Sequence, residues 1–252
     1  MKTSRSSAPL RGVVVSDLHL FAQRSAGADY FAALKPQLIA ADVLVLNGDI
    51  FDFRWSTLPS VESTAVHALE WLAAASAALP ACDIHYVLGN HDCPTFFQAK
   101  LAEFARGRPR LHCHPLGLRI GPAVFVHGDC AHRKMDPAGL RRYRAAWDND
   151  RGHRPWQTRA YVAADRIGVT ALTHRGWFPR EKTVGRVTHY LDRAQPGWRE
   201  RTGDCYFGHT HLPFSNHRSG TIRFHNTGSG IRGMGFNPVQ FSVEREPFES
   251  LN

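Results

Sequence analysis

Five short apolar runs in this chain each end in an acidic, amide or histidine side chain. They occur at residues 13–19, 42–49, 85–92, 124–129 and 205–211. Uninterrupted apolar runs of this kind are typical of strands buried on both faces. In α/β sheets ligands bind beyond the carboxyl ends of the strands, so five such ends can converge on one place. The pattern therefore predicts an α/β enzyme with a metal site at that edge.

Strand and helix patterns alternate through the first half of the chain. Strands are expected at residues 12–16, 43–46, 83–88 and 123–126, with a short β excursion over 111–120, and helices at 27–40, 60–79 and 96–104. This alternation indicates right-handed crossovers and a mainly parallel sheet. Three further strands are expected near the end of the chain, at residues 213–216, 221–225 and 239–243.

The alternation breaks between residues 131 and 204. No apolar strand in this segment ends in a metal-binding side chain, and its pattern favours helices in pieces, such as residues 137–147 and 157–166. We therefore expect a core formed by residues 1–130 and 205–252, with an inserted, mainly helical cap at residues 131–204.

Positive charge is concentrated in the expected cap. Residues 131–205 hold 16 Lys and Arg against 8 Asp and Glu, a net charge of +8 out of +9 for the whole chain, and four of the six tryptophans. Such a block can face substrate phosphates, anionic lipid or nucleic acid. Alternatively, the charged side chains form a solvated helical surface that binds no partner.

Composition adds two expectations about the environment of the protein. The chain has no apolar run near the ~18 residues that a membrane-spanning helix needs. Its five cysteines form an odd set without a paired Cys-x-x-Cys spacing, which suits reduced thiols. We therefore expect a cytoplasmic location, and peripheral contact with the inner membrane through the basic cap is a further hypothesis.

The polar strand ends offer a mixed set of oxygen and nitrogen donors. The donors are Asp17, His19, Asp49, Asn90, His127, His209 and His211. The two oxygens of one carboxylate can bridge two cations, which lie ~3.5–4 Å apart in two-metal sites. Oxygen and nitrogen donors together suit Mn, Fe, Zn, Ni or Co better than Mg or Ca.

Taken in order, these segments form a recognisable series of motifs. The series is Asp17-x-His19, Gly48-Asp49-x-x-Asp52, Gly89-Asn90-His91-Asp92, His127 and Gly208-His209-x-His211. It resembles the calcineurin-like metallophosphoesterases, whose fold is a layered β-sandwich flanked by helices. The resemblance implies an enzyme with two divalent metals, Mn foremost. It also implies that Asp49 bridges the two ions, that His91 acts as the acid toward the departing oxygen, and that Asp52 orients His91.

The resemblance implies two sets of metal ligands. One ion would be held by Asp17, His19, Asp49 and His211, and the other by Asp49, Asn90, His127 and His209.

Within this family the chain is similar to the UDP-2,3-diacylglucosamine hydrolases of lipid A synthesis, which cut a pyrophosphate and use an insertion as a lid over acyl chains. The resemblance implies a lipid-nucleotide or other phosphorylated small-molecule substrate. The residues expected to bind it are Asn90, Arg141, Arg142, Tyr143 and Arg144. Guanidinium groups suit this task because they bind phosphate through two parallel hydrogen bonds. The chain departs from many members of that branch, which have Arg where it has His91.

Two other functions stay open from the sequence. A nuclease or nucleotide phosphodiesterase of the same fold would use the basic cap on a polynucleotide backbone, and its binding would weaken with salt. A metal-binding scaffold without catalysis would be expected to lack His91 or several ligands, whereas this chain keeps them all.

Overall fold

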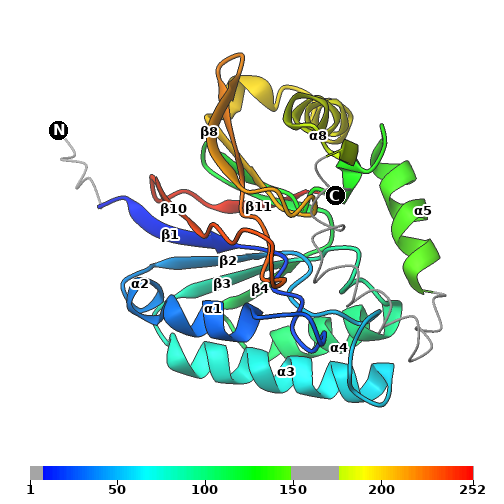
Figure 1. Ribbon diagram of the computed structural model, residues 1–252. Coiled ribbons are helices and arrows are strands. Elements are labelled where there is room, and N and C mark those ends of the chain that lie inside the picture. The colour runs from blue at the N-terminus through cyan, green and yellow to red at the C-terminus, as the bar shows by residue number, and fades with distance from the viewer. Residues whose placement is uncertain (1–7, 149–175, 252) are drawn as a thin grey trace.

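The computed structural model describes residues 8–148 and 176–251. Two β-sheets lie face to face, and helices cover the outer face of each (Figure 1). Apolar residues from both sheets, such as Val14 and Val45 from one and Phe125 and Tyr206 from the other, form the buried layer between them. This arrangement confirms the expected α/β fold, a layered β-sandwich flanked by helices.

The first sheet has five strands in the order β10-β1-β2-β3-β4. Its strands are β1 (Leu10–Val15), β2 (Val43–Asn47), β3 (Asp83–Val87), β4 (Leu111–His114) and β10 (Val239–Val243). Neighbours among β1 to β4 are parallel, as the alternation of strand and helix predicts, and only β10 runs antiparallel at one edge. Every residue of β2 is buried, which explains its uninterrupted apolar sequence.

Four helices cover the outer face of the first sheet. They are α1 (Gly27–Ala33), α2 (Lys35–Ile39), α3 (Val61–Ala78) and α4 (Thr95–Arg106). The side chain of Ser60 caps α3 as expected, because its hydroxyl accepts a hydrogen bond from the Ser63 amide at 3.1 Å. The single helix expected over residues 27–40 is wrong: it divides at Leu34, since Pro36 has no amide hydrogen to continue the bonding of α1.

The second sheet has six strands in the order β11-β5-β6-β7-β9-β8. Its strands are β5 (Gly117–Ile120), β6 (Ala123–Phe125), β7 (Asp204–Phe207), β8 (Phe214–Ser219), β9 (Ile222–Asn226) and β11 (Phe248–Leu251). The β excursion expected over residues 111–120 is shared between the two sheets, because β4 closes the first and β5 belongs to the second. Strand β11 was not predicted: only Leu251 of its four residues is buried, so it shows no apolar run.

Two longer helices pack against the apolar cluster of the second sheet. These are α5 (Pro137–Asp148) and α8 (Arg180–Ala194), which are accompanied by the short 3-10 helices η1 (Asp129–Ala131) and η2 (Arg199–Arg201). Val187 and Tyr190 of α8 are buried in the same apolar cluster as Val124 of β6 and Phe207 of β7. The helix expected at residues 157–166 lies outside the described residues. No helix in the described ranges is long and apolar enough to cross a membrane.

Candidate metal centre

The polar residues that follow five strands meet at one edge of the two sheets. Asp17 and His19 follow β1, Asp49 follows β2, Asn90 and His91 follow β3, His127 follows β6, and His209 and His211 follow β7. Three of these strands belong to the first sheet and two to the second. The sandwich therefore brings together all seven predicted metal ligands, together with the predicted catalytic pair Asp52 and His91.

The backbone of these loops is held in an uncommon conformation. Asp17, His19, Asp49, His209 and His211 have φ angles between 48° and 63°, in the left-handed region that non-glycine residues rarely adopt. Hydrogen bonds between loops fix this geometry: the Asp17 amide donates to the Gly48 carbonyl at 2.9 Å and the His19 amide to the Asp49 carbonyl at 3.0 Å. Such strain is typical of functional sites whose surroundings over-determine the backbone.

Asp17, His19 and His211 form the first cluster of potential ligands. Nε2 of His211 lies 3.2 Å from Oδ1 of Asp17 and 3.2 Å from Nε2 of His19. All three side chains are buried, and one donor atom of each lies within 4.8 Å of the others. This spacing could hold one metal ion.

Asp49, His127 and His209 form the second cluster. Nε2 of His127 lies 3.2 Å from Oδ2 of Asp49, and that same oxygen lies 4.0 Å from Nε2 of His19 in the first cluster. The Asp49 carboxylate therefore stands between the clusters, where a bridging ligand belongs.

Buried donor atoms at the centre fit a metal ion. The amide oxygen Oδ1 of Asn90 is buried without a hydrogen-bond partner among the described residues. Oδ1 of Asp17 and Nε2 of His127 are buried too and face other candidate ligands, His211 and Asp49, at 3.2 Å. Unpaired buried polar atoms are costly and therefore rare. Oxygen and nitrogen donors of this kind match divalent transition metals, so the residues present fit the metals that the sequence predicts.

The charges at the centre favour a cation. Burial opposes ionisation of Asp17, but its contacts with His19 and His211 outweigh burial and hold its pKa well below the usual range. Burial likewise disfavours a charged His127, yet the Asp49 carboxylate raises the pKa of His127 to about 10. Burial and the neighbouring His127 lower the pKa of His209 to about 3. The carboxylates are thus ionised in a buried site and attract positive charge.

Asp52 connects two histidines beside the metal clusters. Its Oδ2 lies 3.0 Å from Nδ1 of His19 and its Oδ1 lies 2.9 Å from Nδ1 of His91. Asp52 is fully buried and also accepts the amide of Trp55 at 2.8 Å. It therefore fixes one metal-site histidine and His91 at the same time.

Asp92 ties two of the motif loops together. Its carboxylate accepts hydrogen bonds from the Ile50 amide at 2.8 Å, the Gly89 amide at 2.6 Å and the Tyr86 hydroxyl at 2.6 Å. The side chain is fully buried. Asp92 thus holds the loop that carries Asn90 against the loop that carries Asp49.

A pocket of about 280 Å³ opens onto the centre. Besides the metal-site residues it is lined by Arg24, Arg54, Trp55, His132, Tyr143, Trp147, Trp177 and Phe178. Trp147 of α5 contacts the ring of His91, with centroids 4.7 Å apart, and Tyr143 stacks on His132 at 5.3 Å. The pocket therefore combines a buried polar floor with aromatic walls and two guanidinium groups.

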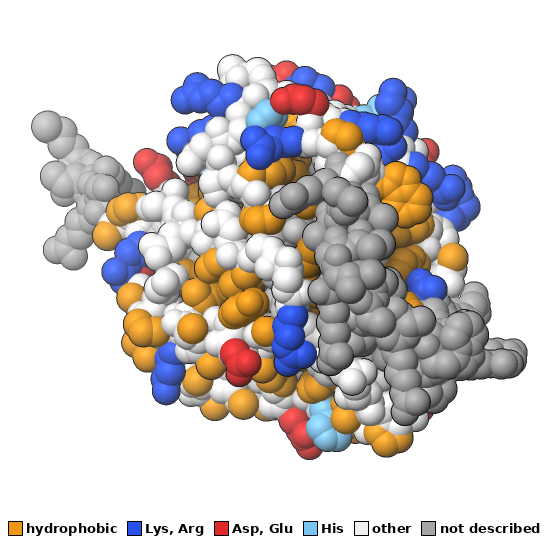
Figure 2. Space-filling view, in the orientation of Figure 1, with side chains coloured by type: hydrophobic (Ala, Val, Ile, Leu, Met, Phe, Trp, Pro, Cys, Tyr) orange, Lys and Arg blue, Asp and Glu red, His pale blue; other side chains and the backbone are white. Residues whose placement is uncertain are grey.

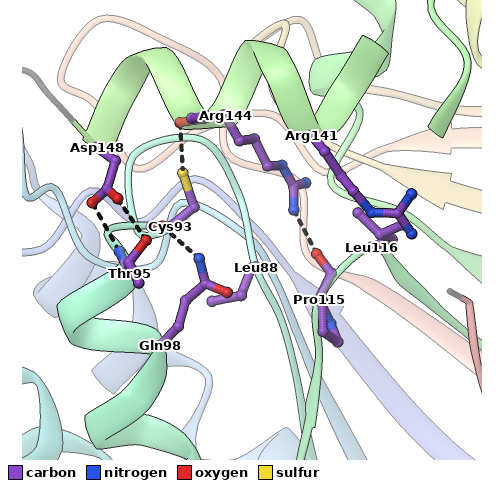
Figure 3. Close-up of a pocket in the computed structure, with 10 residues that line it drawn as sticks. Leu88, Cys93, Thr95, Gln98, Pro115, Leu116, Arg141, Arg144 and Asp148 are labelled. Carbon is purple, nitrogen blue, oxygen red and sulfur yellow. Dashed lines mark hydrogen bonds between the residues drawn. The ribbon is translucent and has the colours of Figure 1, made fainter. Parts of the chain in front are cut away.

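The predicted substrate-binding residues divide between two places. Asn90 and Tyr143 line the metal pocket. Arg141 and Arg144 instead line a separate cavity of about 430 Å³ between α5 and α4 (Figure 3). The Arg144 guanidinium is buried and donates two hydrogen bonds to Asp129, at 2.6 and 3.0 Å.

The third predicted arginine, Arg142, lies on the exposed side of α5. The structure therefore does not bring Arg141, Arg142 and Arg144 to the metal centre.

Arg24, Arg54 and Trp55 line the metal pocket but were not singled out from the sequence. Each follows a motif residue within five positions in the chain. Arg24 is five residues after His19, and Arg54 and Trp55 are two and three residues after Asp52. Their place within the loops that carry the ligands is a signal that could have identified them.

A layered α/β sandwich with two His–Asp clusters at the ends of its strands defines a metal-dependent hydrolase. Residues 10–213 match the family described as calcineurin-like phosphoesterase. The chain belongs to this family and is a metallophosphoesterase. No curated protein matches it.

Two solved structures are similar to this chain. YfcE, a phosphoesterase from E. coli, is 17% identical with a TM-score of 0.42, and the match covers 92% of this chain and 87% of that one. A dimetal phosphatase from Danio rerio is 12% identical with a TM-score of 0.48, and the match covers 97% of this chain and 99% of that one.

Proposed function

We propose that this metallophosphoesterase hydrolyses a phosphoester or pyrophosphate bond with two divalent metal ions, Mn foremost, with Fe, Zn, Ni or Co as alternatives. The position of the Asp49 carboxylate between the two buried clusters carries this proposal. Asp17, His19 and His211 would complete the ligands of one ion. Asn90, His127 and His209 would complete those of the other.

The proposed chemistry divides between the metals and the chain. When bound, the two ions supply a water of lowered pKa and neutralise charge on the phosphoryl oxygens. His91 protonates the departing oxygen from its second ring nitrogen, because Nδ1 faces Asp52 at 2.9 Å. Asp52 fixes the orientation of that ring, and Trp147 packs against it.

For the substrate we propose a diphosphate such as UDP-2,3-diacylglucosamine or a related phospholipid or nucleotide. The guanidinium groups and aromatic rings that line the metal pocket support an anionic substrate with an apolar or planar portion. We further propose that residues 131–204 form a functional cap on the core of residues 1–130 and 205–252. Tyr143 and Trp147 of α5 and Phe178 lie in this segment and line the pocket.

We also propose that the cap contacts anionic membranes at their surface. Figure 2 shows Lys and Arg side chains spread over the region of α8 and β8, and Arg180, Lys182 and Arg186 belong to α8. Sedimentation with anionic liposomes at low salt tests this contact. Protein that stays in the supernatant contradicts it.

A nuclease or nucleotide phosphodiesterase remains the second proposal, since the concentration of positive charge in residues 131–205 also fits a polynucleotide backbone. Cleavage of single-stranded DNA, with binding that weakens steeply as salt increases, would favour it over the diphosphate proposal.

A metal-loaded panel tests the proposed reaction. Bis-p-nitrophenyl phosphate, p-nitrophenyl phosphate, UDP-2,3-diacylglucosamine and single-stranded DNA are each offered to the wild type and to Asp49→Ala. We expect this variant to lose more than about 100-fold in turnover on every compound that the wild type cleaves. Asp29→Ala, on the exposed surface of α1, is the matched control. Full turnover by Asp49→Ala would refute the dinuclear mechanism.

His91→Ala tests the proton donor separately. We expect a loss of about 10²- to 10⁴-fold on an alkyl phosphodiester, which needs its departing oxygen protonated. The loss should be smaller on bis-p-nitrophenyl phosphate, because p-nitrophenolate departs without a proton. Equal losses on the two kinds of ester would contradict the role given to His91.

A further inference from the structure

Arg54 is fixed beside the metal centre by the same residue that orients His91. Its backbone amide donates to Oδ1 of Asp52 at 3.1 Å, and the next amide, of Trp55, donates to the same oxygen at 2.8 Å. Arg54 also lines the pocket that contains Asp49, Asn90 and His91. The position of Arg54 is therefore tied to the geometry of the catalytic loops.

Aromatic rings hold the guanidinium group of Arg54. Its Cζ lies 4.5 Å from the centroid of the Trp147 ring and 6.0 Å from that of Trp55. Trp147 in turn lies 4.7 Å from the His91 ring. A guanidinium that packs against aromatic rings keeps its charge, and its planar set of donors matches the geometry of a phosphoryl group. Arg54 and His91 therefore contact the same Trp147 ring and line the same pocket.

The proposed function already assigns the binding of one phosphoryl group at this site to the metal ions. Under the proposed function, on which this inference rests, the bound metals would neutralise the phosphoryl group that is attacked. His91 marks the side on which the leaving group departs. Arg54 lies toward that side, since it and His91 contact the same Trp147 ring. A guanidinium there matches a substrate whose leaving group is itself anionic, because a guanidinium can bind a phosphoryl group through two parallel hydrogen bonds.

We propose that Arg54 binds the second phosphoryl group of a pyrophosphate-linked substrate and is the residue that selects such substrates over simple phosphate esters. The neighbouring rings of Trp147 and Trp55 position its guanidinium. Arg141, Arg142 and Arg144, which the sequence suggested for phosphate binding, lie away from the metal pocket. In this proposal the phosphate-binding arginine comes from the loop after β2 and not from α5.

Inhibition by two anions of different length tests the proposal. Hydrolysis of bis-p-nitrophenyl phosphate is measured in excess metal with methylenediphosphonate, which carries two phosphoryl groups, or with inorganic phosphate, which carries one. For Arg54→Gln we expect the ratio of the two inhibition constants, methylenediphosphonate over phosphate, to rise about 10- to 100-fold, the worth of one hydrogen bond to a charged group. Arg54→Lys keeps the charge without the planar donors and should fall between Gln and the wild type.

Calorimetric binding of both anions to the metal-loaded protein gives the same comparison without turnover. Arg106→Ala, at the exposed end of α4, is the matched control and should leave the ratio unchanged. A ratio in Arg54→Gln within about twofold of the wild type, by either method, overturns the proposal. Absence of hydrolysis by the metal-loaded wild type would instead count against the proposed function, while the binding ratio still decides the role of Arg54.

Discussion

Replacement of Arg144 by methionine should destabilise the protein strongly. The Arg144 side chain joins α5 to η1, since Nε and Nη2 donate to the two oxygens of Asp129 at 2.6 and 3.0 Å and Nη1 donates to the Pro115 carbonyl. Burial disfavours the charge on Asp129, but Arg144 outweighs this effect and lowers the pKa of Asp129. Residue Arg144 is 8% exposed and Asp129 is 1% exposed.

The structure sets the size of this effect. Methionine fills most of the space of arginine but leaves the Asp129 carboxylate buried without its partner. Removing one member of a buried ion pair costs about 3–5 kcal/mol. Replacing both members by apolar residues is often close to neutral, so the double variant Arg144→Met/Asp129→Leu should recover most of the loss.

Urea unfolding of the four proteins, namely the wild type, both single variants and the double variant, measures the coupling between the two residues. Arg142→Met is the matched control, because Arg142 is exposed two positions earlier in the same helix. It should change the free energy of unfolding by less than about 0.5 kcal/mol. A loss below about 1 kcal/mol in Arg144→Met, or additive losses in the double variant, would refute the reasoning.

Three further predictions follow from other parts of the structure. Gly48→Ala should lower metal content and activity, because a Cβ at φ +84° would collide with the ring of a metal-site histidine. Gly107→Ala is the control, since a Cβ there meets open space. Metal analysis should find the wild-type metal content in Gly107→Ala and less metal in Gly48→Ala. Burial lowers the pKa of His85 to about 3 and of His114 to about 4, so the unfolded chain binds protons that the folded protein does not, and stability falls as the pH drops from about 6.5. The loss should reach about 2 kcal/mol for each histidine at about pH 5. Urea unfolding at about pH 7 and pH 5 measures this loss of stability. The loss should be smaller in His114→Gln than in the wild type and the same as in the wild type for the exposed His67→Gln. A wild-type loss in His114→Gln would contradict the role given to His114. Removal of metal by a chelator should abolish activity and lower the melting temperature. A metal present at a hundredfold of its Kd adds about 2.7 kcal/mol to the free energy of unfolding, and the chelator removes this contribution. An unchanged melting temperature after chelation would argue against a stabilising ion.

Much of the fold was accessible from the sequence because its strands are buried on both faces. Uninterrupted apolar runs identified β1, β2, β3, β6 and β7, and Ser60 marked the start of α3. Strand β11 gave no such signal because three of its four residues are exposed, and it is defined by pairing with β5. Pairing between distant segments leaves no periodic trace in a short polar strand.

The arginines show why local spacing could not complete the candidate site. Residues 141–144 are adjacent in the chain, but a helix turns about 100° per residue and sends neighbours to different sides. Tyr143 and Trp147, four residues apart, share the side that faces the metal pocket. Arg141 and Arg144, three apart, share the side that faces the other cavity.

The sequence by itself determined which side chains can coordinate metal, because the loops that carry them directly follow buried strands and the motifs fix their order. Only the tertiary structure decided how the two sheets combine these loops, and that Asp49 stands between clusters drawn from both. It also decided that Arg54, and not the arginines of α5, faces the metal pocket. The physical reason is that side-chain identity is local, whereas the packing of sheets and the rotation of a helix against them depend on contacts between residues far apart in the chain.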